Sequence, residues 1–217
     1  ELAVKLAPGW NLPYLALATL FYELKSTKQT LGYIEKALAV TKNSSSYSQL
    51  ANNLMYQLAD IDRAESMYLK SLELDSLNIS SLNGIAYVYK ATGDMLKSKE
   101  FLDKAYTVDS ANYHTMLGLS DYFYETDKEK DAVSWLKKIL KTDTNYIYAA
   151  RKLGDLYYKG WDFDSSYVYY RRYLNSELND RKISRRFQTV KSVIDNGEAQ
   201  KMRQFYHNFR RFVSDTT

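Results

Sequence analysis

The chain has 217 residues, no cysteine and a formal net charge of +4. The lack of cysteine excludes disulfide bonds and thiol catalysis, and a hydrophobic content of 45% is enough to form a continuous core. No run of roughly 18 or more apolar residues is present, so we expect no membrane span. The compartment stays unknown: such a soluble chain can be cytoplasmic or periplasmic, because a removed export signal would leave no trace.

From residue 11 to residue 180 the sequence repeats every 34 residues without an insertion. We call a set of residues that lie 34 positions apart a column of the repeat. One column has only small side chains: Thr30, Ala64, Ser98, Ala132 and Ser166. Another column is apolar: Leu17, Ala51, Ile85, Leu119 and Leu153. Small side chains let two helices approach closely, while bulky neighbours fill the space around the crossing. The pattern predicts five helical hairpins, at 11–44, 45–78, 79–112, 113–146 and 147–180.

The first ten residues fit the same register. Ala3 and Pro8 fall where the second helix of an earlier repeat would end. We therefore predict that residues 1–10 are the end of a preceding helix.

Turn-forming residues recur at one phase of the repeat, at 75–78, 109–112 and 143–145. Asp, Ser and Asn side chains hydrogen-bond nearby backbone groups and favour turns and helix caps. Acidic pairs between the two helices of a hairpin, such as Asp60 with Asp62 and Asp162 with Asp164, are interpreted as caps or solvated turns. The spacing leaves about 12–14 residues for each helix.

After residue 180 the register degrades, but two apolar stripes remain. The first is Ile183, Phe187, Val190 and Ile194, and the second is Met202, Phe205, Phe209 and Phe212. Asn196 and Gly197 between them indicate a turn. Because an array of repeats exposes apolar surface at each end, we predict a C-terminal capping helix pair at 181–217. The phenylalanines also leave formation of a homodimer open.

The period and its small and bulky columns resemble the tetratricopeptide repeat (TPR) family over residues 11–180. The family's early tryptophan is absent, and its proline after the second helix is retained only at Pro8. The resemblance implies an all-α fold, a right-handed α-α superhelix or solenoid of antiparallel helical hairpins. It also implies that the first helices of successive hairpins line a concave wall.

Tyrosine is abundant on the wall that the resemblance implies, and the chain has 21 tyrosines in all. A tyrosine ring offers a broad apolar face, a hydroxyl group and few rotors to immobilise, which suits recognition. The predicted partner-binding groove consists of Tyr22, Asn53, Tyr56, Tyr87, Lys90, Asp121, Tyr124, Tyr148, Arg151 and Tyr158. The alternative left open is that these rings pack against neighbouring helices and only thicken the wall.

The predicted function is a protein-interaction scaffold that binds a partner peptide or helix in this groove. The alternative is a non-catalytic module of a larger envelope-assembly or regulatory protein. We predict no enzyme, metal or cofactor, because His114 and His207 are isolated and no phosphate-binding loop or zinc-ligand spacing is present. The basic doublets after residue 170 are too sparse to favour nucleic-acid binding over a solvated helix face.

Overall fold

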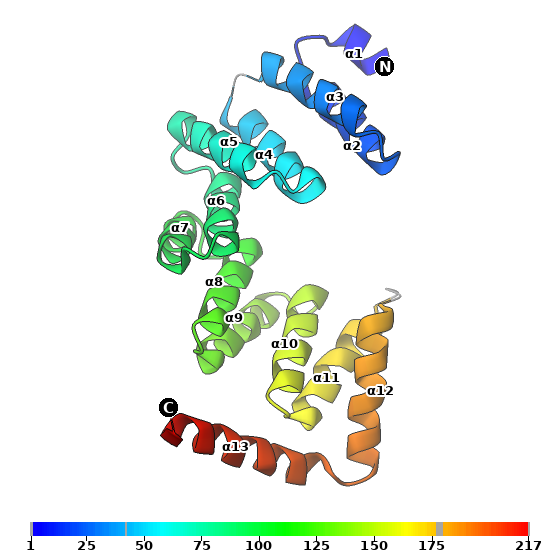
Figure 1. Cartoon of the computed structure of the whole chain (residues 1–217), viewed down its shortest axis with the longest axis vertical. Helices are drawn as coiled ribbons and strands as arrows, with labels where there is room; N and C mark the ends of the chain where they lie inside the picture. Colours follow the sequence, from blue (N-terminus) through cyan, green and yellow to red (C-terminus); the bar gives the residue numbers. More distant parts are fainter. Residues whose placement is uncertain (1, 42, 177–179, 217) are drawn as a thin grey trace. The chain divides into compact units, whose positions relative to one another are not determined.

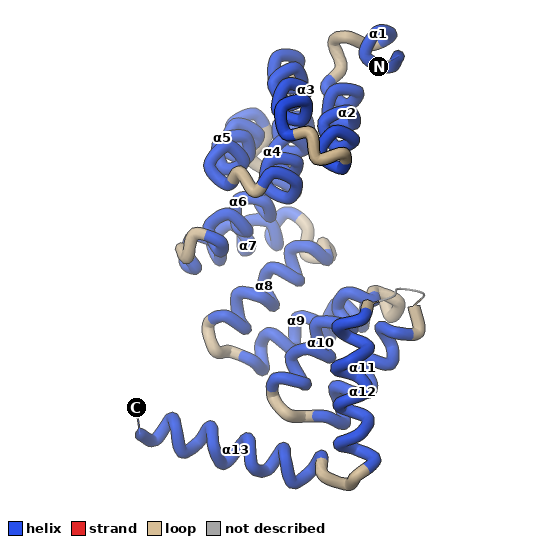
Figure 2. Tube along the Cα trace, turned by 45° about the vertical axis from the view of Figure 1, so that its right-hand side comes forward, coloured by secondary structure: helices blue, strands red, loops and turns tan. Residues whose placement is uncertain are grey.

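The computed structural model describes residues 2–41, 43–176 and 180–216, and every regular element in these ranges is an α-helix (Figures 1 and 2). The helices are α1 (Leu2–Leu6), α2 (Asn11–Glu23), α3 (Thr27–Val40), α4 (Ser44–Leu58), α5 (Ile61–Leu74), α6 (Ile79–Ala91), α7 (Met95–Val108), α8 (Tyr113–Glu125), α9 (Glu129–Thr142), α10 (Ile147–Lys159), α11 (Phe163–Leu174), α12 (Arg181–Asp195) and α13 (Ala199–Thr216). Residues 42 and 177–179, in the first and fifth predicted repeats, lie outside the described residues.

The chain divides into two compact blocks, Glu1–Gly118 and Leu119–Thr217. In the N-terminal block, α2 pairs with α3, α4 with α5, and α6 with α7, which makes three consecutive helical hairpins (Figure 1). The first helices also contact one another, α2 with α4 and α4 with α6. Ile34, Leu50 and Ile85 are fully buried between these hairpins. The prediction of an all-α fold of successive hairpins is confirmed.

The columns that predicted the repeat are buried as expected. Ile85, Leu119 and Leu153 have relative exposures of 0%, 1% and 0%. The whole small column is buried as well: Thr30, Ala64, Ser98, Ala132 and Ser166. Leu17, the first member of the apolar column, is only half-buried. The repeat therefore reflects the packing between helices rather than a surface pattern.

The turn inside each hairpin contains one residue with a left-handed backbone, again every 34 residues. These residues are Lys25, Ala59, Gly93, Asp127 and Trp161, with φ between 53° and 88°. For a residue with a Cβ atom, this left-handed conformation is unfavourable by roughly 1–2 kcal/mol. Glycine occupies only one of the five positions, so glycine alone would not have located these turns in the sequence.

Side-chain caps fix where the helices begin. Asp60, Asp94 and Asp162 accept backbone N–H groups at the starts of α5, α7 and α11, and Asn43 and Asn78 do the same for α4 and α6. The interpretation of Asp60 and Asp162 as capping residues is confirmed. Helices α2 to α12 are 12–15 residues long, close to the expected length.

The C-terminal block continues the pairing through α12. Helix α10 packs against α9 and α11, and α12 packs against α11, where Ile183 and Val190 are buried with Tyr170 and Tyr173. Helix α13 does not run back along α12; it extends across the end of that helix and contacts α11 (Figure 1). Phe205, Phe209 and Phe212 of α13 are 63%, 55% and 66% exposed.

Candidate partner-binding surface

Three consecutive first helices of the N-terminal block each expose a predicted groove tyrosine. Tyr22 on α2, Tyr56 on α4 and Tyr87 on α6 are 43%, 62% and 46% exposed. The rings of Tyr56 and Tyr87 lie 5.7 Å apart between centroids, at an interplanar angle of 52°. We call the surface of α2, α4 and α6 around these three tyrosines the A face.

Hydrogen bonds between neutral side chains connect the helices beneath the A face. Between α2 and α4, the Gln57 side-chain amide donates to Thr19 Oγ1 at 3.1 Å. Between α4 and α6, Ser48 Oγ donates to Ser80 Oγ at 2.9 Å. Asn53, another predicted groove residue, is half-buried and donates its amide to the backbone oxygen of Gln49 on the same helix. The bond of Gln57 connects α2 with α4 and the bond of Ser48 connects α4 with α6, whereas the bond of Asn53 lies within α4.

Charge is nearly absent from the helices of the A face. Helix α4 has no charged residue, and α2 and α6 have one each, Glu23 and Lys90, in the last two positions of their helices. The half-buried Lys90 makes an interaction within the chain. Partial burial raises the pKa of the Tyr56 phenol, and the neighbouring Tyr87 raises it further, so this hydroxyl also stays neutral at physiological pH.

The second helices of the same hairpins carry the charges instead. Helices α3, α5 and α7 contain both signs, and several of these residues form exposed pairs along one helix. Lys99 pairs with Asp103 at 2.6 Å and Lys104 with Glu100 at 2.7 Å. The block is therefore charged on one side of its hairpins and neutral on the other.

The predicted groove residues of the C-terminal block are mostly engaged within the chain. Asp121 forms an ion pair with Lys152, and Tyr124 accepts a hydrogen bond from Lys159 at 2.8 Å. Arg151 is half-buried on α10.

The two remaining predicted tyrosines of this block differ from each other. Tyr148 is 52% exposed. Tyr158 is half-buried and packs edge-on against Phe163, at 6.0 Å between centroids, while the Arg186 guanidinium lies 5.3 Å from its ring centroid. The packing alternative thus describes the surroundings of Tyr158 better than those of Tyr148.

The C-terminal block contains two ion pairs at equivalent positions of successive repeats, and neither was predicted from the sequence. Asp121 pairs with Lys152, and Asp155 pairs with Arg186 at 2.5 Å. Asp155 also accepts a hydrogen bond from the buried Tyr170 hydroxyl at 2.7 Å. Burial, with help from Asp155, raises the pKa of Tyr170. Burial opposes the charge of Arg186, yet bonds to Tyr170 and Asp155 raise its pKa overall. Both pairs occupy identical columns, which is a signal that could have revealed them.

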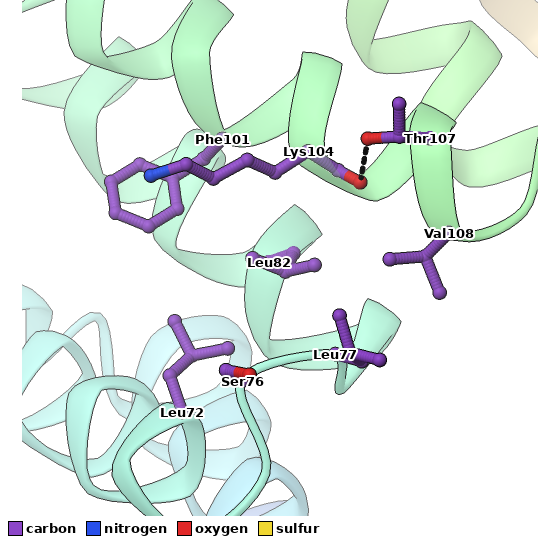
Figure 3. A pocket seen from close by; sticks show the side chains of 8 residues that line it. All are labelled: Leu72, Ser76, Leu77, Leu82, Phe101, Lys104, Thr107 and Val108. Atoms are coloured by element: carbon purple, nitrogen blue, oxygen red, sulfur yellow. Dashed lines mark hydrogen bonds between the residues drawn. The ribbon is translucent and has the colours of Figure 1, made fainter.

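An apolar hollow of about 660 Å³ opens on the charged side of the N-terminal block, between α5, α6 and α7 (Figure 3). It is lined by Leu72, Ser76, Leu77, Leu82, Phe101, Lys104, Thr107 and Val108. The Lys104 ammonium lies 4.9 Å from the centroid of the Phe101 ring, along one wall of the hollow. This hollow was not predicted from the sequence, because its lining residues come from different columns of the repeat.

Two further properties bear on function. None of the described helices has the length and apolar character needed to cross a membrane. Within residues 2–41, 43–176 and 180–216, no three or more His, Asp or Glu side chains come together in a way that could bind a metal ion.

Comparison with known proteins supports the repeat directly. The profile of the tetratricopeptide repeat family matches residues 79–112, the third predicted repeat. The TPR repeat-containing protein MJ1428 of Methanocaldococcus jannaschii is 24% identical, over 82% of this chain and 31% of its own length. The chain thus spans about a third of that relative. No enzyme family is indicated by these similarities.

Solved structures share the architecture. TTC0263 of Thermus thermophilus, a thermophilic TPR protein, has a TM-score of 0.70 at 16% identity, covering 83% of this chain and 98% of its own. PilF of Pseudomonas aeruginosa has a TM-score of 0.66 at 18% identity, covering 95% and 93%. YrrB, described as a TPR protein with an unusual peptide-binding site, has a TM-score of 0.54 at 20% identity, covering 78% and 88%. At these identities the likeness concerns the fold, and with the family match and the repeated packing it identifies the chain as a tetratricopeptide repeat protein.

Proposed function

We propose that the chain is a protein-interaction scaffold whose A face binds an extended segment of a partner protein. Tetratricopeptide repeat proteins are generally protein-interaction modules. The observation that carries the proposal is the exposure of Tyr22, Tyr56 and Tyr87 on three consecutive first helices. Such a row offers anchors to a partner that runs across the hairpins rather than along one helix.

Tyrosine supplies binding energy from a small rigid area. A well-covered aromatic anchor contributes roughly 2 kcal/mol or more to a protein interface. Because Asn53, Gln57 and Thr19 are already hydrogen-bonded, little of the surface needs to be ordered when a partner binds. Tyr56, the most exposed of the three tyrosines, is expected to contribute most.

The remaining predicted groove residues differ in how accessible they are to a partner. In the C-terminal block only Tyr148 keeps an exposed ring among the predicted tyrosines. Asp121, Tyr124 and Tyr158 would have to leave partners in their own block before contacting a ligand. We therefore propose the A face as the principal binding surface.

Alanine substitution of both Tyr56 and Tyr87 tests this proposal. A partner isolated with the wild-type protein from the source cells should be lost from the double variant, with a dissociation constant raised at least about tenfold for the purified pair. Leu96→Ala, which removes an 80% exposed side chain from α7 on the charged side, serves as the matched control and should retain the partner. Equal retention by the double variant and the control would reject the A face as the binding surface.

The alternative is a non-catalytic module of a longer protein that assembles the cell envelope or regulates another domain. The greater length of MJ1428 is compatible with a longer parent. The full gene tests it, since an open reading frame without a further domain would count against it.

A further inference from the structure

We infer that α13 binds an anionic membrane surface, with Phe205, Phe209 and Phe212 inserted among the lipid chains. This site belongs to the C-terminal block, so it adds a second interaction to the one proposed for the A face. Three features carry the inference: an aromatic strip along α13, the attachment of α13 by a different side, and the positive charge of the final helix pair.

Helix α13 exposes three phenylalanines on one side. Phe205, Phe209 and Phe212 are 63%, 55% and 66% exposed, and their spacing of four and three residues places them on one side of the helix. The rings of Phe205 and Phe209 stack at 6.5 Å between centroids. We call these three residues the phenylalanine strip. At this exposure the strip leaves roughly 300–400 Å² of aromatic surface in water. An exposed apolar surface of this size is typical of an interaction site.

The attachment of α13 to its block uses a different side of the helix. Tyr206 stacks on Trp161 at 5.9 Å between ring centroids, and Arg203 pairs with Asp162 at 3.2 Å. At about 100° per residue, Tyr206 and Arg203 lie roughly a third of the way around the helix from the strip. Helix α13 is therefore held on its block while most of the strip remains exposed.

The final helix pair carries a positive charge that suits acidic lipid headgroups. Residues 181–217 contain nine Lys or Arg and three Asp or Glu, a net of +6. Arg186, Arg203 and Arg210 form ion pairs within the block. Five other basic residues of the pair are exposed: Arg181, Lys182, Arg185, Lys191 and Lys201. Lys201 lies one turn before Phe205, on the side of the strip. The basic doublets alone favour no partner, but a basic helix with exposed phenylalanines is typical of a segment that lies in a membrane interface.

Charge and area favour a membrane over a second copy of the chain. Two copies joined through the strip would bring two helix pairs of net +6 together, and their repulsion opposes association. The strip also supplies only about half of the roughly 800 Å² that each partner buries in a stable protein interface. Because the strip is the outer side of one helix, a folded protein would need a matching groove, whereas lipid chains adapt to a ridge. An anionic bilayer meets both requirements.

Co-sedimentation of the full chain with lipid vesicles tests the inference. Phosphatidylcholine vesicles with about 30% phosphatidylglycerol should bind the protein at about 0.1 M salt, and pure phosphatidylcholine vesicles should bind it at least about tenfold more weakly. Binding to the anionic vesicles should weaken at least about threefold at roughly 0.5 M salt, because salt screens the attraction.

Variants connect vesicle binding to the strip. The combined Phe209→Ser and Phe212→Ser change should weaken binding to the anionic vesicles at least about tenfold. Phe205 is kept, because its ring lies 6.3 Å from that of Trp161 and can help to attach α13. The combined Tyr56→Ala and Tyr87→Ala change is the control and should leave vesicle binding unchanged.

A fluorescent label measures insertion at single positions. Because the chain has no cysteine, Phe209→Cys and His207→Cys each provide one site for an environment-sensitive fluorophore. Both positions are exposed, and they lie on opposite sides of α13. On anionic vesicles the emission from position 209 should shift to shorter wavelength, as in apolar surroundings, whereas position 207 should keep its emission in water.

Three outcomes would overturn the inference. One is equal binding to both kinds of vesicle, or binding to neither. Another is an equal wavelength shift from positions 207 and 209. The third is a protein interface at the strip: a dimer in light scattering without lipid, or binding of an acidic helical peptide, that the two serine changes abolish. In each case the proposed function stands, because its test uses Tyr56 and Tyr87 of the other block.

Discussion

Tyrosine side chains in this chain have opposite roles at positions that look alike in the sequence. Tyr22, Tyr56, Tyr124 and Tyr158 share one column of the repeat, but Tyr124 and Tyr158 are half-buried. The ammonium of Lys159 lies 4.4 Å from the Tyr124 ring centroid, and Arg186 covers Tyr158. The column of Arg186 holds Gly84 in the N-terminal block, so Tyr56 has no counterpart of Arg186 beside it. The sequence could identify the column, but exposure depends on residues from a neighbouring helix.

Gly84 shows how a single missing side chain determines local packing. A Cβ atom at position 84 would lie 2.2 Å from Cζ of Tyr68, whose ring is fully buried and whose hydroxyl donates to Asn52 at 2.6 Å. Because the ring cannot move without breaking this bond, Gly84→Ala should destabilise the protein by about 1–3 kcal/mol.

Gly32→Ala in α3 is the matched control for this prediction. Nothing lies within 4 Å of the added methyl group at position 32, so the change should stabilise the helix by up to about 1 kcal/mol. Urea unfolding of both variants measures the difference. Equal stabilities would show that Tyr68 does not pack as closely on α6 as described.

Helix length was the most predictable feature at the scale of the element. The repeat predicted about 12–14 residues for each helix, and acidic turns predicted capping residues, because capping is a local interaction. The position of α13 was not predictable in the same way. In the α10–α11 hairpin the large Tyr170 side chain packs closely against Gly154. The last repeat has Gln188 and Gln204 in these columns. Trp161 instead stacks on Tyr206, at 5.9 Å between ring centroids.

Because of the cap of α7, the stability of the protein should decrease in acid. The Lys97 backbone N–H donates to Asp94 at 3.0 Å and, with the Lys97 ammonium, holds the pKa of Asp94 below its ordinary value. A lowered folded-state pKa stabilises the protein above the ordinary pKa of Asp, near 4, and this stabilisation is lost as pH falls through the folded-state value.

Asp94→Asn keeps a capping acceptor and removes the titration. Its free energy of unfolding should therefore fall less than that of the wild type between about pH 7 and pH 3, as measured by urea unfolding at both values. Identical losses in the two proteins would mean that the charge of Asp94 does not stabilise α7.

At the scale of the whole molecule, the two blocks share one packing pattern but differ in surface chemistry. The first helices of the N-terminal block are almost uncharged, whereas α10 and α12 carry charges that form Asp155–Arg186 and related pairs. Buried columns repeat because every hairpin must cover its neighbour, so the fold was readable from the sequence. Exposed columns have no such constraint, and for that reason the tyrosine surface was predicted only in outline.

The most direct test of the account is photo-crosslinking in the source cells, with a photoreactive amino acid placed at position 56 on the A face or at position 96 on the charged side. Both positions are exposed, at 62% and 80%, so each can report a contact without disturbing the core. The account predicts a discrete partner protein crosslinked from position 56, absent when Tyr87 is alanine, and no such product from position 96. A partner captured from position 96 and not from position 56 would contradict the assignment of the A face as the binding surface.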